Sequence, residues 1–245
     1  MLEADPKYLK YLQSLPDGLR QQWLEGSWDD FDVEGAYYIT PFKQAEREGR
    51  VNVVPIETSL PTYTAWDLGM ADSTAIWVFQ VFKKEVRFIG HYENSGEGLQ
   101  HYVNWLKDFR DKHGFTYTDH FFPHDVQVRE LTSGQSRLDS LRRMGVKGKL
   151  VPNYGIMDGI ELGRELIGRS WFDANRCKDG IRCIKNYRKE FDEKLNKFKD
   201  KPLHDWSSHS ADAFRYAAVA IKTYVREVGF AKNTLIVPQD DWNPY

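Results

Sequence analysis

The stretch TAWDLGMADSTAIWVFQ (residues 64–80) joins two apolar runs and carries an aspartate at each side of the junction. Both runs are rich in β-branched and aromatic residues, a composition that favours two strands connected by a tight turn. Asp67 ends the first run and Asp72 stands just before the second. An ionised carboxylate in an apolar hairpin is costly unless it is paired, hydrogen-bonded or bound to a metal. We therefore expect Asp67 to face a compensating group.

The composition is that of a globular protein: of 245 residues, 41% are hydrophobic and 29% are charged. A net charge of −2 gives no overall attraction to nucleic acid, so such binding would need local basic patches. The two cysteines, Cys177 and Cys183, lack the second pair that a four-ligand zinc site requires, and we expect reduced thiols. We find no signal peptide or membrane span in the sequence and expect a soluble intracellular protein.

The hairpin opens a longer alternation of strand and helix patterns. Strands are expected over residues 61–69, 73–82, 86–96, 118–126 and 147–153. Helices are expected over residues 96–114, 136–145, 159–173 and 209–227. The first three strands form an antiparallel meander, and the later alternation of β and α implies parallel strands with covering helices.

This order of elements is that of the RNase H-like fold, an α/β fold with a mixed central sheet and helices on both faces. In that order Asp67 on the first strand, Asp125 at the end of the fourth strand and Asp212 on the late helix converge at one edge of the sheet. Clustered carboxylates repel one another unless a hard divalent cation neutralises them. Two Mg²⁺ or Mn²⁺ ions about 3.5 to 4 Å apart can clamp an in-line displacement at phosphorus.

Further candidates surround these three acids. His209 lies three residues before Asp212 on the same helix face, where it could be a metal ligand, a general acid or base, or a phosphate contact. Asp72 and Asp205 are additional candidate ligands: Asp72 could instead cap the turn before the second strand, and Asp205, which precedes the late helix, could be a fourth acid.

Basic side chains form a candidate DNA-binding surface that would contact phosphates rather than base edges. The alternative is an ordinary solvated face. The residues are Arg129, Arg142, Arg143, Lys147 and Lys149.

Three segments resemble the nuclease motifs of the large terminase subunit of tailed double-stranded DNA bacteriophages. They are DLGMADSTAI (67–76), FFPHDVQVREL (121–131) followed by GQSRLDSLRRMG (134–145), and HDWSSHSADAFRYAA (204–218). The resemblance extends over roughly residues 20–222. It implies a metal-dependent endonuclease that cuts concatemeric phage DNA in the host cytoplasm, with the small terminase subunit and the portal as partners. It also implies a protein that is absent from the mature virion.

Members of that family also carry an N-terminal packaging ATPase. A phosphate-binding loop reads G-x-x-x-x-G-K-[ST], but the nearest candidate, GVKGKL (145–150), has the wrong spacing and ends in Leu150. We therefore expect a linker over residues 1–58, a nuclease domain over 59–225 and a tail over 226–245.

Three alternatives stay open at this point. One is another RNase H-like nuclease of the resolvase or transposase type. The second is a non-catalytic module that docks on DNA or protein. The third is an actin-like or sugar-kinase ATPase, suggested by Asp67-Leu-Gly with Thr74 nearby, although the chain lacks the length for the duplicated core of that superfamily.

Overall fold

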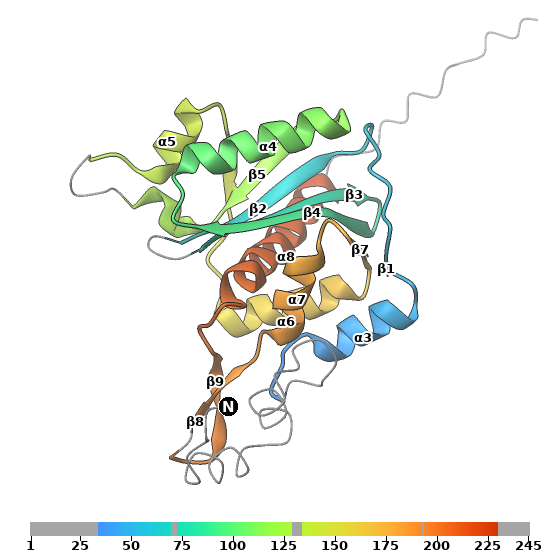
Figure 1. The fold of residues 1–245 in the computed structure, drawn as a ribbon, viewed down its shortest axis with the longest axis vertical. Helices are drawn as coiled ribbons and strands as arrows, with labels where there is room; N and C mark the ends of the chain where they lie inside the picture. The colour runs from blue at the N-terminus through green and yellow to red at the C-terminus, as the bar shows by residue number, and fades with distance from the viewer. Residues whose placement is uncertain (1–33, 70–72, 129–133, 193, 230–245) are drawn as a thin grey trace, which may run out of the picture.

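A seven-stranded mixed sheet forms the centre of the molecule (Figure 1). The computed structural model describes residues 34–69, 73–128, 134–192 and 194–229. The strand order across the sheet is β1-β7-β4-β3-β2-β5-β6. The strands are β1 (Val51–Asn52), β2 (Thr62–Leu68), β3 (Ser73–Phe82), β4 (Glu85–Ser95), β5 (Tyr117–Phe122), β6 (Lys149–Leu150) and β7 (Ser170–Asp173).

Strand β3 is antiparallel to both of its neighbours, β2 and β4, whereas every other adjacent pair in this sheet is parallel. Strands β2, β4, β5, β6, β7 and β1 consequently run in the same direction. Their carboxyl ends share one edge of the sheet, which is where open α/β sheets place their ligand sites.

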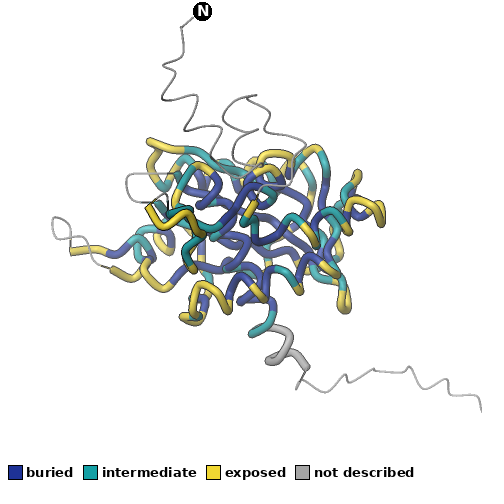
Figure 2. Tube along the Cα trace, turned by 90° about the horizontal axis from the view of Figure 1, so that it is seen from below, coloured by how far each residue is buried: buried dark blue, intermediate teal, exposed yellow. Residues whose placement is uncertain are grey.

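Helices cover both faces of the sheet (Figure 1). One face carries α4 (Leu99–His113) and α5 (Arg137–Arg143). The other carries α3 (Ile39–Arg47), α6 (Ile156–Ile167), α7 (Lys178–Asn186) and α8 (Ser208–Gly229). The buried part of the chain runs through the middle of these layers (Figure 2). A two-stranded hairpin, β8 (Lys189–Asp192) with β9 (Lys197–Pro202), projects away from the sheet.

Helix α8 packs directly on the central strands β2 and β3. Its sheet-facing side is formed mainly by small residues, since Ala213, Ala217 and Ala220 are all buried. The ring of Phe214 meets that of Trp77 on β3 in an edge-on contact at 5.9 Å between centroids. Because alanines let the helix approach closely, side chains in its first turn can reach the carboxyl end of β2.

The expected fold class is confirmed, with the meander and the parallel strands in place. One strand is shorter than expected: β5 ends at Phe122 rather than at residue 126. Pro123 cannot donate a ladder hydrogen bond, so the strand stops before it. Residues His124–Gln127 form a short 3₁₀ helix, η1, and Asp125 lies on this turn.

The helix expected over residues 159–173 was wrong in its second half. Helix α6 ends at Ile167, and residues 170–173 form β7, which lies between β1 and β4. Gly168 caps the helix. The side chain of Arg50 then bridges the carbonyl oxygens of Ile167 and Ser170, at 2.6 Å each, and so holds the turn between the two elements.

Several elements were absent from our expectations. Helix α7 and the β8–β9 hairpin fall in the lysine- and arginine-rich stretch after residue 176. The expected boundary at residue 58 does not coincide with a boundary in packing, because Tyr37, Tyr38 and Phe42 belong to the same core as α8. The first 33 residues of the expected linker, and the expected tail beyond residue 229, lie outside the described residues.

Candidate active site

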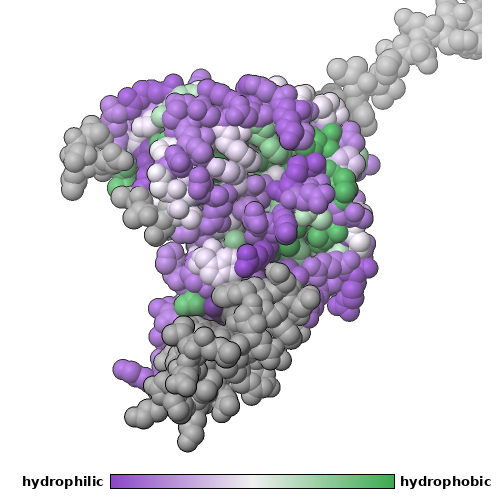
Figure 3. Space-filling view, viewed as in Figure 1, coloured by the Kyte–Doolittle hydropathy of each residue, from purple (hydrophilic) through white to green (hydrophobic). Residues whose placement is uncertain are grey.

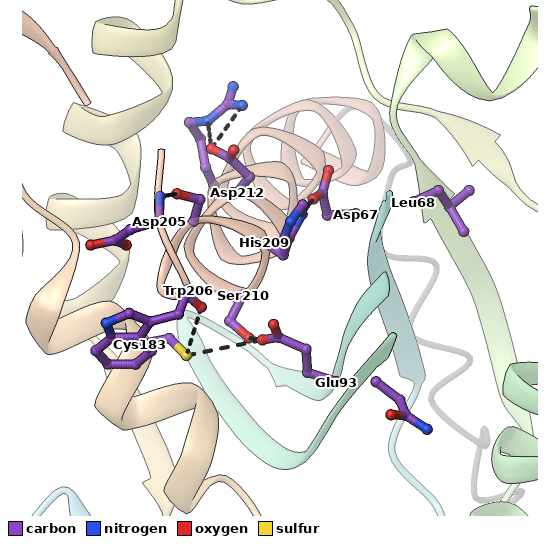
Figure 4. A network of polar contacts seen from close by, with 12 residues as sticks. Asp67, Leu68, Glu93, Cys183, Asp205, Trp206, His209, Ser210 and Asp212 are labelled. Atoms are coloured by element: carbon purple, nitrogen blue, oxygen red, sulfur yellow. Dashed lines mark hydrogen bonds and ion pairs between the residues drawn. The ribbon is translucent and has the colours of Figure 1, made fainter. Parts of the chain in front are cut away.

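The central contact of the site joins β2 to α8 (Figure 4). Nδ1 of His209 lies 2.9 Å from Oδ2 of Asp67. Both side chains are largely buried, with exposed fractions of 13% and 17%. The group that faces Asp67 in this structure is therefore a histidine from the first turn of α8.

The charges of two predicted carboxylates, Asp125 and Asp212, act on the third, Asp67. Burial is the main cause that raises the pKa of Asp67, and the negative charges of Asp212 and Asp125 raise it further. The hydrogen bond and charge of His209 oppose these effects. Three acids from β2, η1 and α8, which are distant in sequence, are thus brought to one edge of the sheet.

Asp125 is the exposed member of this group. It lies on η1, whose Val126 is fully buried and anchors the turn against the core under α5. The backbone of Val128 donates to the carbonyl oxygen of Asp125 at 2.9 Å and closes the turn. The carboxylate therefore comes from a compact turn rather than from the strand itself.

Asp212 has two partners that converge on one oxygen. Arg215 approaches Oδ1 with Nε at 3.2 Å and Nη2 at 3.1 Å. The hydroxyl of Tyr187 donates to the same oxygen at 3.2 Å. Arg215 is nearly buried, with 6% of its surface exposed.

A polar chain fixes the first turn of α8 to β4. The Ser210 hydroxyl donates to Oε2 of Glu93, so His91, with Nε2 at 2.6 Å, must donate to the same hydroxyl. Burial lowers the pKa of His91 to about 3, which keeps its ring neutral. Trp77 adds a bond from Nε1 to the Ser210 carbonyl at 2.8 Å.

Sequence reasoning missed Glu93. The sheet register pairs Asp67 with Ala75 and Ala75 with Glu93, so the two acids lie in one row of the sheet. Side chains in such a row point to the same face. The alternation in strand β4, combined with the expected meander, could have identified this residue.

The structure places Asp205 away from Asp67 (Figure 4). Its Oδ1 accepts hydrogen bonds from the backbone nitrogen and hydroxyl of Ser207, at 2.9 and 2.6 Å. Its Oδ2 lies 3.2 Å from Nη1 of Arg188. Asp205 thus organises the turn that leads into α8. Asp72 lies outside the described residues.

No group of three or more His, Cys, Asp or Glu residues in the described part of the chain is arranged closely enough to hold a metal ion.

Cys183 lies near Glu93 and the Trp206 carbonyl, at 4.0 Å from each (Figure 4). Its thiol is buried, and burial raises its pKa to about 12. The two cysteines are free thiols.

Of the candidate DNA-binding residues, Arg142 and Arg143 lie on α5, Lys147 lies just before β6, and Lys149 begins β6. The face of the molecule drawn in Figure 3 is largely hydrophilic. Arg142 is 3.8 Å from Asp139, and Arg143 contacts Gln135. Lys149 pairs with Asp119 at 3.3 Å. Lys147 is exposed, and Arg129 lies outside the described residues.

The fold is shared with solved phage structures. The large terminase of a thermophilic bacteriophage aligns with a TM-score of 0.56 and 22% identity over 89% of this chain and 53% of that one. The P22 large terminase nuclease domain aligns with a TM-score of 0.53 and 15% identity over 71% of this chain and 89% of that one. The chain thus has the RNase H-like fold of terminase nuclease domains.

This chain spans about half the length of the thermophilic-phage terminase. The manganese-bound nuclease domain of the SPP1 large terminase also aligns, with a TM-score of 0.49 and 14% identity over 66% of this chain and 86% of that one. At this score the likeness adds nothing to the fold assignment. No family model and no curated protein matches the sequence.

None of the helices in the described part of the chain is long and apolar enough to cross a membrane.

Proposed function

We propose that this chain is the nuclease domain of a phage large terminase and cuts double-stranded DNA by divalent-metal-dependent hydrolysis of phosphodiester bonds. The observation that carries the proposal is the convergence of Asp67, Asp125 and Asp212 from β2, η1 and α8 at the carboxyl edge of the sheet, where the charges of Asp125 and Asp212 act on Asp67. The fold shared with the thermophilic-phage and P22 terminase structures supports it. The reaction would cut the concatemeric viral genome during packaging.

The kinds of donor atom at this edge suit a hard divalent cation, although no three of them lie close enough together in the described part of the chain to hold one as they stand. Asp67 is largely buried and lies in the field of two further negative charges, with His209 as the opposing partner. Mg²⁺ and Mn²⁺ take carboxylate oxygens, and Mg²⁺ often needs only one or two carboxylates, with water and phosphate oxygens filling the remaining positions. Asp67, Asp125 and Asp212 would hold two such ions. The chemistry supplied there would be the activation of a water molecule and the stabilisation of the leaving oxygen.

His209 orients the Asp67 carboxylate. A proton on Nδ1 of His209 is donated to Oδ2 of Asp67, and this bond favours the ionised form of the carboxylate in spite of its burial. The histidine thereby opposes the effect of burial, which raises the pKa of Asp67. Oδ1 of the same carboxylate remains the oxygen to be offered to a cation.

DNA would reach the site along the basic side chains. Arg142, Arg143, Lys147 and Lys149, together with Arg129, would contact phosphates, which gives weakly sequence-specific and salt-sensitive binding. Action in the host cytoplasm, with the small terminase subunit and the portal as partners, belongs to the same proposal.

The proposal is tested by incubating the protein with supercoiled plasmid in Mn²⁺, Mg²⁺ or EDTA. Asp67→Asn, Asp125→Asn and Asp212→Asn should each abolish cleavage. The matched control is Asp200→Asn, because the Asp200 side chain on the β8–β9 hairpin is 94% exposed. Cleavage that requires metal, is lost in the three variants and persists in the control would support the proposal.

Two other results would favour a different function. DNA binding without metal-dependent cleavage by the wild-type protein would favour a docking module. Strong preference for a four-way junction over a linear duplex of the same sequence would favour a nuclease of the resolvase type.

A further inference from the structure

Two side chains from different parts of the chain converge on a single oxygen of Asp212. Arg215, one turn further along α8, and Tyr187, at the end of α7, both contact Oδ1. None of these contacts uses Oδ2. These two residues therefore hold Oδ1 of the carboxylate and leave Oδ2 available.

We infer that Tyr187 and Arg215 are positioning residues that fix the Asp212 carboxylate through Oδ1 and so present Oδ2 to a divalent cation. This inference rests on the proposed function, because it assigns Asp212 as a metal ligand. It adds two residues from outside the predicted set of ligands and DNA contacts. Partners of this kind usually tune metal affinity by orienting the ligand.

Arg215 is held too tightly to take another position. Its side chain is 8% exposed, and its guanidinium stacks on the ring of Tyr216 at 4.6 Å. A Cβ atom added at Gly159 of α6 would lie 2.7 Å from Cγ of Arg215, which shows how closely α6 covers the aliphatic stem. A buried arginine needs its carboxylate partner, and the planar group approaches Asp212 through two nitrogens.

Tyr187 is braced by the segment that precedes α3. The backbone nitrogen of Tyr37 donates to the Tyr187 carbonyl at 2.9 Å. The ring of Tyr38 stacks on that of Tyr187, with centroids 6.0 Å apart and an interplanar angle of 14°. Burial raises the pKa of Tyr187, so its hydroxyl stays protonated and can donate to Asp212.

Tyr187 also stands at the root of the β8–β9 hairpin. The next residue, Arg188, pairs with Asp205 in the turn before α8. Two consecutive residues, Tyr187 and Arg188, thus contact Asp212 and Asp205, respectively. The position of these two residues, rather than α8 alone, sets the orientation of the Asp212 carboxylate.

The test uses Tyr187→Phe, which removes one hydroxyl and keeps the ring. Tyr38→Phe is the matched control: it makes the same change in the stacked neighbour, whose hydroxyl has no hydrogen-bond partner in the described structure. Arg215→Lys is the second variant, since it keeps the charge and loses the fork. Metal-free crystal structures report the Asp212 orientation, and calorimetric titration with MnCl₂ reports affinity.

We expect Tyr187→Phe and Arg215→Lys to turn the Asp212 carboxylate and to weaken Mn²⁺ binding about tenfold. Tyr38→Phe should leave both unchanged. In an Asp212→Asn background, Tyr187→Phe should cause no further loss of affinity, whereas a merely structural role would still produce one.

An unchanged Asp212 orientation in both variants would overturn the inference, and so would Mn²⁺ affinity equal to that of the wild type. A wild-type protein that cuts no DNA would contradict the proposed function alone. In that case, or if the wild type binds no Mn²⁺, the carboxylate orientation in the crystal structures still decides whether Tyr187 and Arg215 position Asp212.

Discussion

His209 and Asp67 are 142 residues apart in sequence, yet their side chains meet at 2.9 Å. The contact joins the last helix of the described chain to a central strand of the sheet. It needs the small-residue face of α8, because a bulkier face would hold the helix further from β2. The contact therefore forms only when α8 is packed on the central strands of the sheet.

Replacing Asp67 by asparagine should stabilise the metal-free protein. The pKa of Asp67 is raised, so the folded state loses stability as the pH rises through the pKa of the unfolded chain towards that of the folded protein. Above that pH range, the ionised carboxylate lowers the stability of the folded protein by its full amount. The asparagine side chain can still accept the His209 hydrogen bond, and we expect a gain of about 1 kcal/mol at pH 7. Urea denaturation at pH 7 in EDTA measures it, and a loss of stability would contradict the electrostatic argument.

Removal of Asp212 should cost more stability than removal of Asp125. Asp212→Ala leaves Arg215 buried without its partner, and we expect a loss of about 2 to 3 kcal/mol, less than for a fully buried pair because Asp212 is 26% exposed. Asp125 is exposed, so Asp125→Ala should change stability by less than about 0.5 kcal/mol. Thermal melts of the two variants compare these effects directly. Equal losses would show that Arg215 does not depend on Asp212.

Asp205→Ala should destabilise the protein without removing metal-dependent cleavage. Its carboxylate caps the turn before α8 and pairs with Arg188, which is 8% exposed at the side chain. Loss of the cap and of the ion pair should cost about 2 kcal/mol. Cleavage per folded molecule, measured well below the melting temperature, should stay within about twofold of the wild type. A complete loss of cleavage would return Asp205 to the list of metal ligands.

Acidification should weaken the fold through two histidines, His91 and His120. Burial lowers the pKa of His91 to about 3 and that of His120 to about 4. The unfolded chain takes up these protons below about pH 6.5 while the folded chain does not, so stability falls as the pH drops from 6.5 towards 4. His120→Gln should flatten this decline by up to about 1.4 kcal/mol per pH unit. Denaturation of the variant and the wild type at pH 7, 6 and 5 tests this prediction. Parallel plots of stability against pH for the two proteins would contradict it.

Lys147→Ala should weaken DNA binding equally for all sequences. A lysine that contacts phosphate contributes about one unit to the slope of log affinity against log salt, and the variant should lose that unit. Lys84→Ala is the control, because Lys84 is also exposed but lies in the turn at the opposite end of β4 from Glu93. Fluorescence anisotropy at several salt concentrations gives both slopes. Equal slopes for the two variants would exclude Lys147 from the DNA contact.

The order of elements in the sequence predicts that three acids lie at one edge of the sheet, and their role as metal ligands stays a prediction. Asp67, Asp125 and Asp212 could be placed because strand ends and helix starts define where an open sheet brings side chains together. His209 followed from its spacing to Asp212 on a helix. These inferences needed only the periodicity and the order of strands and helices.

Other residues depended on tertiary contacts. The partner of Asp205 is Arg188, which belongs to a hairpin hidden in a stretch of mixed charge. Tyr187 reaches Asp212 only because Tyr37 and Tyr38 brace it from a segment we expected to be a linker. Strand β7 was mistaken for helix because its four residues continue an apolar pattern beyond Gly168.

The position of α8 also has a consequence for biosynthesis. Strand β2 emerges from the ribosome before α8: the two residues that join them are 142 positions apart, which at about 5 to 20 residues per second is roughly 7 to 28 s of translation. During that interval the apolar face of the nascent sheet lacks its cover, and chaperones are the expected protection against aggregation. Asp67 and His209 meet only when α8 has been made, so a chain that ends before this helix has no assembled site.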